Sequence, residues 1–77
     1  METNLPPLNE LDVVALIEPL SEHRLVRGQV GTVVGEWEPG AYEVEFSDHK
    51  SGQTIALVAL PSAKLMRLHY TPIATTK

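Results

Sequence analysis

The stretch VGTVVGEWEPGAYEVEF, residues 30–46, decides the fold of this chain. Apolar and acidic residues alternate in its second half, which predicts a β-strand with Tyr42, Val44 and Phe46 directed into a core. A Pro-Gly pair precedes this strand, and a glycine at the third position of a type II turn supplies the positive φ that the turn requires. The stretch therefore predicts a β-hairpin with one face on a hydrophobic core.

The first strand of this hairpin is predicted over Val30–Trp37. Strict alternation puts the even-numbered residues on one face and Gly31, Val33 and Gly35 on the other. Two glycines make the second face shallow, so another backbone can approach closely there or the strand can bend.

Three further segments have the composition of strands: Asp12–Ile17, Thr54–Leu60 and Leu65–Leu68. The second of them is almost wholly apolar, which predicts cover on both faces or a place in a barrel wall. Residues 61–64 allow one short 3₁₀ turn before the last strand. Five short strands separated by Gly/Pro turns predict an all-β fold, a small five-stranded barrel.

The 77 residues are enough for one domain. We expect a flexible N-terminal arm over residues 1–10, the barrel domain over 11–69 and a C-terminal tail over 70–77. Leu5 and Leu8 of the arm could still dock onto the domain. They could cover the apolar fourth strand, and pairing of two copies through an open strand edge is the alternative cover.

Composition excludes several classes of site. The chain has no cysteine, so it has no disulfide, thiolate zinc site or cysteine nucleophile. No apolar run reaches the roughly 20 residues of a membrane helix, and the N-terminus lacks the pattern of a signal peptide. We therefore expect a cytoplasmic protein that does not bind a membrane.

The charge is unevenly distributed along the chain. The net charge is −4; all ten acidic residues lie at or before Asp48, and four of the six basic residues follow it. Phosphate binding needs several lysines and arginines on one face, so this balance argues against nucleic acid as a partner. The carboxylates are either ordinary solvated strand faces or a patch that steers a basic partner protein.

Four carboxylates surround the single tryptophan of the predicted hairpin, and these five residues are the candidate partner-binding site: Glu36, Trp37, Glu38, Glu43 and Glu45. An exposed tryptophan ringed by carboxylates suits a binding hot spot, because tryptophan supplies contact area and charge selects the partner. The alternative is that Trp37 folds over the barrel end and caps the core. The scarcity of other large aromatic residues favours this alternative.

Nothing in the sequence predicts catalysis, a metal or a cofactor. The histidines, His23, His49 and His69, lack the spacing of a metal motif, although His23 and His49 each follow an acidic residue. No serine has the G-x-S-x-G setting of a nucleophile. Paired catalytic carboxylates need a cleft that raises a pKa, and a hairpin surface offers none. We therefore expect no enzyme activity.

Four motifs together resemble a known family: DVVAL at 12–16, RGQVGTVV at 27–34, EPGAYEVEF at 38–46 and TIALVAL at 54–60. Over residues 11–68 the chain resembles a bacterial family of domains of unknown function, the one numbered 4926. The resemblance implies an SH3-like β-barrel and brings no catalytic residues. Members are encoded beside small proteins that resemble toxin-associated domains, which implies an antitoxin or immunity role.

These observations lead to three functional hypotheses. The first is a non-catalytic module that docks a basic partner protein through the acidic hairpin, in its most specific form an antitoxin-like inhibitor. The second is an accessory subunit of a larger enzyme or electron-transfer complex. The third is an RNA-binding module of the KOW type, because the string at 27–34 is similar to strings in such modules; the acidic balance argues against it.

Overall fold

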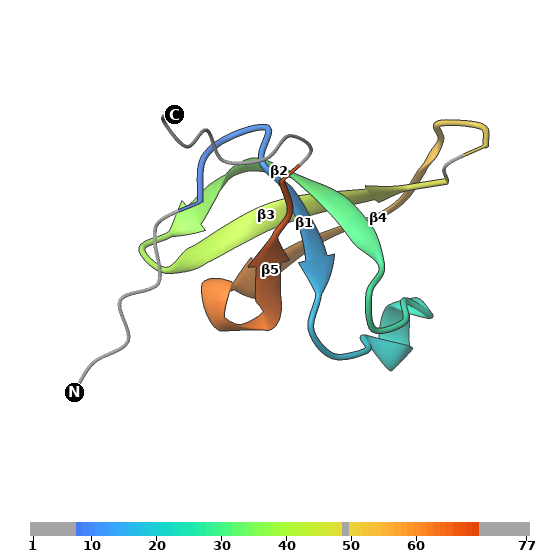
Figure 1. The fold of residues 1–77 in the computed structure, drawn as a ribbon, viewed down its shortest axis with the longest axis horizontal. Helices are drawn as coiled ribbons and strands as arrows, with labels where there is room; N and C mark the ends of the chain where they lie inside the picture. Colours follow the sequence, from blue (N-terminus) through green and yellow to red (C-terminus); the bar gives the residue numbers. More distant parts are fainter. Residues whose placement is uncertain (1–7, 49, 70–77) are drawn as a thin grey trace, which may run out of the picture.

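A computed structural model describes residues 8–48 and 50–69 of the chain. Its five strands are β1 (Val13–Leu16), β2 (Val30–Glu38), β3 (Ala41–Ser47), β4 (Thr54–Pro61) and β5 (Leu65–Arg67). Two one-turn 3₁₀ helices accompany them, η1 (Ser21–His23) and η2 (Ser62–Lys64). All five predicted strands are confirmed to within a residue or two at each end, and so is the turn over residues 61–64 (Figure 1). The described part of the chain contains no helix long and apolar enough to cross a bilayer.

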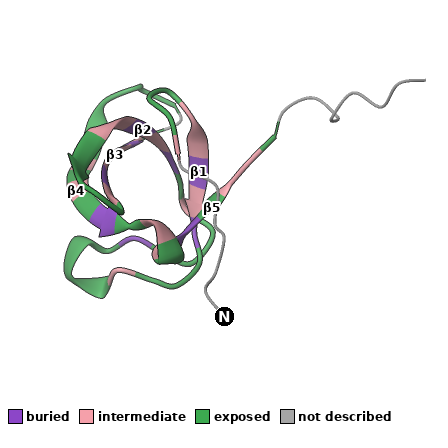
Figure 2. Ribbon diagram, turned by 90° about the vertical axis from the view of Figure 1, so that its left-hand side faces the viewer, coloured by how far each residue is buried: buried purple, intermediate pink, exposed green. Residues whose placement is uncertain are grey.

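The strands form one antiparallel sheet in the order β4-β3-β2-β1-β5. Seen along the long axis of the molecule, the sheet curls around a central core (Figure 2). The fold is therefore the predicted all-β, five-stranded SH3-like barrel, and β4 and β5 are the two edges of its sheet. The β2–β3 turn and the β3–β4 loop lie at opposite ends of the long axis (Figure 1).

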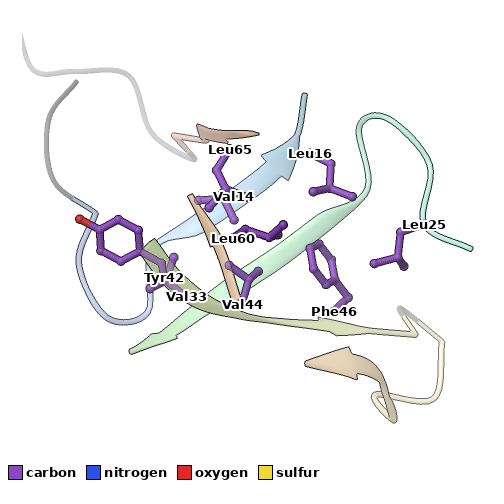
Figure 3. Packing of buried hydrophobic residues seen from close by; sticks show 9 residues of the cluster. All are labelled: Val14, Leu16, Leu25, Val33, Tyr42, Val44, Phe46, Leu60 and Leu65. Carbon is purple, nitrogen blue, oxygen red and sulfur yellow. The ribbon is translucent and has the colours of Figure 1, made fainter. Parts of the chain in front are cut away.

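The core lies on the inner face of the curled sheet. β3 contributes its alternate residues Tyr42, Val44 and Phe46, which confirms the pattern read from the sequence. The whole cluster, shown in Figure 3, consists of Val14, Leu16, Leu25, Val33, Tyr42, Val44, Phe46, Leu60 and Leu65. No polar or charged residue of the described part is fully buried.

Gly31 lets Phe46, the largest fully buried side chain, approach the sheet. A Cβ at this position would lie 2.7 Å from Val44 Cγ1 and 2.8 Å from two ring carbons of Phe46. These contacts are shorter than packed side chains tolerate, so any residue larger than glycine would displace the ring. The shallow face predicted for β2 is therefore the inner face, and side chains of β3 fill it.

Two irregularities in the pairing of β2 with β3 change which residues of β2 face the core. The pairing with β3 shifts between Val33 and Gly35 and again between Glu36 and Glu38. Because of the first shift, Gly35 pairs with Glu43 on the outer face. The prediction that Gly35 shares a face with Gly31 is wrong, since strict alternation takes no account of an extra residue in one strand.

The outer face of β4 is not covered by any described segment. Leu60 is buried and Ala56 and Val58 pack against the core, whereas Ile55 and Leu57 are exposed. The expectation that β4 is covered on both faces is therefore wrong, as far as the described residues 8–48 and 50–69 are concerned. The alternative expectation, a barrel wall, is the one the structure supports.

The end of the predicted arm packs against the domain. Leu8 lies against the core cluster, and its backbone N–H donates a hydrogen bond to the Tyr42 hydroxyl at 3.3 Å. The other docking candidate, Leu5, lies outside the described residues, as do the rest of the arm up to residue 7 and the tail over 70–77.

The Gly31 contact predicts that an alanine substitution destabilises the domain at Gly31 but not at Gly35, the other glycine of β2. Gly31→Ala should lower the free energy of unfolding by about 1–3 kcal/mol, the usual cost of overpacking a core. Gly35→Ala is the matched control, because its Cβ would meet no atom within 4 Å and it should change stability little. Urea unfolding of the two variants measures the difference. Equal effects would contradict the packing role of Gly31.

Candidate functional site

The acidic hairpin, defined as Glu36, Trp37, Glu38, Glu43 and Glu45, lies on β2 and β3. Glu43 and Glu45 alternate with the buried residues of β3, so both face outward, as predicted. Glu38 pairs with Ala41 next to the turn, where Gly40 has the predicted positive φ, 86°. These three carboxylates therefore follow one another along the outer face from the turn inward.

Glu36 is placed differently from the other carboxylates. It pairs with Tyr42, whose side chain points into the core, so the register puts Glu36 toward the inner side of the sheet. It is nevertheless exposed, because this pair lies at the end of the barrel. The structure thus brings Glu38, Glu43 and Glu45 onto one face and sets Glu36 at its margin.

Trp37 does not cap the core. It is 64% exposed and absent from the core cluster and from the side chains packed against it. It is the extra residue of the second shift in β2, between the paired Glu36 and Glu38. Such a bulge re-aims a side chain, so the structure supports the exposed alternative for Trp37. The hydrophobic surface of this residue remains available for contact with another molecule.

Two basic residues of the C-terminal half, Lys64 and Arg67, form ion pairs away from the hairpin. Lys64 Nζ lies 3.1 Å from Glu18 Oε2, and Arg67 Nη2 lies 2.9 Å from Asp12 Oδ2. Both ion pairs join the region of β1 to the region of β5. Within the described residues, no ion pair neutralises a carboxylate of the acidic hairpin. The negative charge of the hairpin is therefore uncompensated by the fold.

Glu45 also takes part in a second feature. Its carboxylate accepts a hydrogen bond from the Thr54 hydroxyl on β4. It lines an open groove of about 510 Å³, together with Ser47, Val13 and the segment from Val26 to Thr32. No motif in the sequence predicts this groove; the Arg27-Gly28 pair, which lines it, is the one available signal.

The described residues contain no cluster of metal-ligating side chains. No group of three or more His, Asp or Glu side chains is placed to hold a metal ion in residues 8–48 and 50–69. His23 and His69 are exposed, and His49 lies outside the described residues. The groove is lined by one cationic side chain, Arg27, and one carboxylate, Glu45.

The fluorescence of Trp37 reports the electrostatic potential around its side chain, because Trp37 is the only tryptophan of the chain. We expect caesium to quench its fluorescence more strongly than iodide does, each normalised to free tryptophan amide at equal ionic strength. Uncompensated carboxylates within about 8 Å, the Debye length at physiological salt, concentrate cations and repel anions. Acrylamide, which is neutral, reports exposure alone and should quench strongly.

A control distinguishes the effect of the hairpin carboxylates on quenching from the effect of the net charge of the chain. The variant Glu36→Gln/Glu38→Gln/Glu43→Gln should lose most of the caesium preference, whereas Glu22→Gln on η1 should keep it. A preference that is absent in the parent, or unchanged in the triple variant, would contradict a field that originates at the hairpin.

The sequence of the chain matches a known domain family. No curated protein and no solved structure matches the chain significantly. The sequence profile described as Domain of unknown function (DUF4926) matches residues 10–67, from just before β1 to the end of β5. All five strands lie within this match, so the chain belongs to the DUF4926 family.

Proposed function

We propose that the chain is a non-catalytic protein-binding module that acts in the cytoplasm and docks a basic partner protein through the acidic hairpin. The observation that carries the proposal is an exposed Trp37 among carboxylates that no cation of the described residues neutralises. Tryptophan is enriched at the centres of interfaces, where its large rigid surface is desolvated.

Charge and apolar surface have separate parts in this proposal. The carboxylates raise the rate of encounter with a positively charged surface and disfavour acidic or neutral competitors. Trp37 supplies the contact that slows dissociation once the partner has arrived, since affinity differences arise mainly in the dissociation rate. High salt should therefore slow association and raise the Kd for the partner.

The more specific form of the proposal is an antitoxin-like or immunity-like inhibitor of a neighbouring gene's product. This form rests on the family resemblance given above and on the chemistry of inhibition by occlusion. A small rigid domain with an acidic face can block the basic substrate-binding surface of another protein without a catalytic group of its own.

Partner capture by matched variants tests the proposal. The tagged chain is incubated with lysate of the cells that produce it, at low and at high salt, and the retained proteins are identified by mass spectrometry. We expect one basic protein, retained at low salt and shed at high salt. With that protein purified, Trp37→Ala should weaken binding by about 2 kcal/mol or more, roughly 30-fold in Kd.

Charge reversal provides the second arm of the experiment. Glu43→Lys/Glu45→Lys should lower the association rate by at least about 10-fold, because it replaces attraction by repulsion. Glu22→Lys on η1 makes a similar change away from the hairpin and should have little effect. If the hairpin variants, folded by circular dichroism, bind as tightly as the parent, the proposal fails.

An accessory subunit of a larger complex is the second candidate function. Several large apolar side chains of the described part are more than two-fifths exposed: Leu11, Ile17, Val26, Val30, Trp37, Ile55, Leu57 and Met66. This amount of apolar surface suits a permanent contact. Retention of a multi-subunit complex at both salt concentrations would favour this function over the first.

A further inference from the structure

Between its two ends, over residues 55–60, the edge strand β4 has no charge and no proline to protect it as a sheet edge. It spans eight residues, pairs with β3 on one side, and contains no charged residue. Within the described residues, no segment forms a ladder on its other side. Long uncharged edges present unpaired backbone groups that accept a further strand.

The other edge of the same sheet is protected. β5 has three residues, ends in Arg67 and is held to Asp12 by an ion pair. Short length and charge are two usual means of blocking edge-to-edge pairing. The contrast within one sheet shows that β4 is the edge open to association.

The side chains of β4 make its exposed surface apolar as well. Leu57 is 55% exposed and Ile55 48%, and Ala59 is exposed beside them. The domain's own Leu8 does not cover them, because it packs against the core on the inner side of the sheet. A strand added at this edge would extend the apolar row.

We propose that β4 pairs antiparallel with β4 of a second copy of this chain, which joins the two sheets edge to edge. A second copy fits because the edge carries no charge that a different partner would have to match. The pairing is independent of the proposed docking function and leaves the acidic hairpin accessible in each copy.

The sequence of β4 is complementary to itself in this arrangement. The pairing with β3 is regular from Ala56 to Pro61. Pro61 has no N–H to donate to a new ladder, which leaves Ala56–Leu60 with Val58 at its centre. A two-fold axis at Val58 sets Leu57 opposite Ala59 of the second copy on the outer face. Large side chains then meet small ones, and outer-face residues meet outer-face residues.

Electrostatic repulsion does not oppose the pairing. The nearest carboxylates on the outer face, Glu43 and Glu45, lie on β3. Two copies joined through β4 separate the two β3 strands by three strand spacings, about 14 Å. This distance exceeds the Debye length of about 8 Å at physiological ionic strength, so the like charges are largely screened.

The contact is small, and its affinity should be modest. One strand pair of this length buries less surface than the roughly 1,200 Å² at the lower limit of stable interfaces. We therefore expect a dimer that dissociates on dilution, with a Kd of about 1–100 µM.

Sedimentation equilibrium of the full chain across this concentration range tests the proposal. The expected result is a monomer–dimer equilibrium. Leu57→Lys should raise the Kd at least 10-fold, and Met66→Lys, at a residue 54% exposed on the protected edge β5, should not. Both side chains are exposed, so neither change should unfold the domain. A monomer at about 1 mM, or equal effects of the two variants, would overturn the proposal.

Deletion of residues 1–7 tests the alternative that the N-terminal arm of the same chain, and not a second copy, covers β4. If the arm covers β4, the full chain is monomeric and only the truncated chain dimerises, which overturns the proposal. Equal dimerisation of both chains supports it.

Cysteine cross-linking tests the register, since the chain has no cysteine of its own. A mixture of Leu57→Cys and Ala59→Cys chains should form a covalent dimer on oxidation, because directly opposed residues fall within disulfide distance. Either variant alone should form much less. Efficient cross-linking of Leu57→Cys alone would overturn the axis at Val58.

Discussion

The contact between the Phe46 ring and the backbone of Gly31 sets the shape of the barrel. The strands that carry them are neighbours, and only a residue without a side chain lets the ring lie against β2. The ring and the branched residues beside it form the inner layer on which the sheet curls. In a domain this small the core has few residues, so the loss of one close contact affects a large part of the stability.

Strand order also decides which charges are neutralised. Because β1 and β5 are neighbours, the basic residues late in the chain meet the acidic residues near β1. The β2–β3 hairpin lies outside these contacts, and none of the ion pairs of the described residues involves its carboxylates. The uneven charge of the linear sequence thus becomes an acidic hairpin at one end of the molecule, through the topology of the sheet and not through composition alone.

Local sequence patterns predict the hairpin, whereas features that depend on strand pairing cannot be predicted from them. The alternation around Val44 and the glycine of the β2–β3 turn were enough to predict the hairpin and its buried face, because both depend on local geometry. The sequence left open whether Trp37 is exposed or caps the core, because the bulge beside it arises from pairing with β3. The sequence likewise left open whether β4 is covered on both faces, because which strand lies at an edge depends on the whole sheet.

The pairing of the first strand with the last has a consequence for how the domain can be connected to other proteins. Val14 pairs with Arg67, and the Leu68 N–H donates to the Val13 carbonyl at 2.8 Å, so the chain enters and leaves the barrel at adjacent points. A domain with adjacent entry and exit can be inserted into a surface loop of a host protein with little separation of the loop's ends. Joining these ends by a short linker and opening the chain in the β3–β4 loop would likewise give a circular permutant with the same sheet.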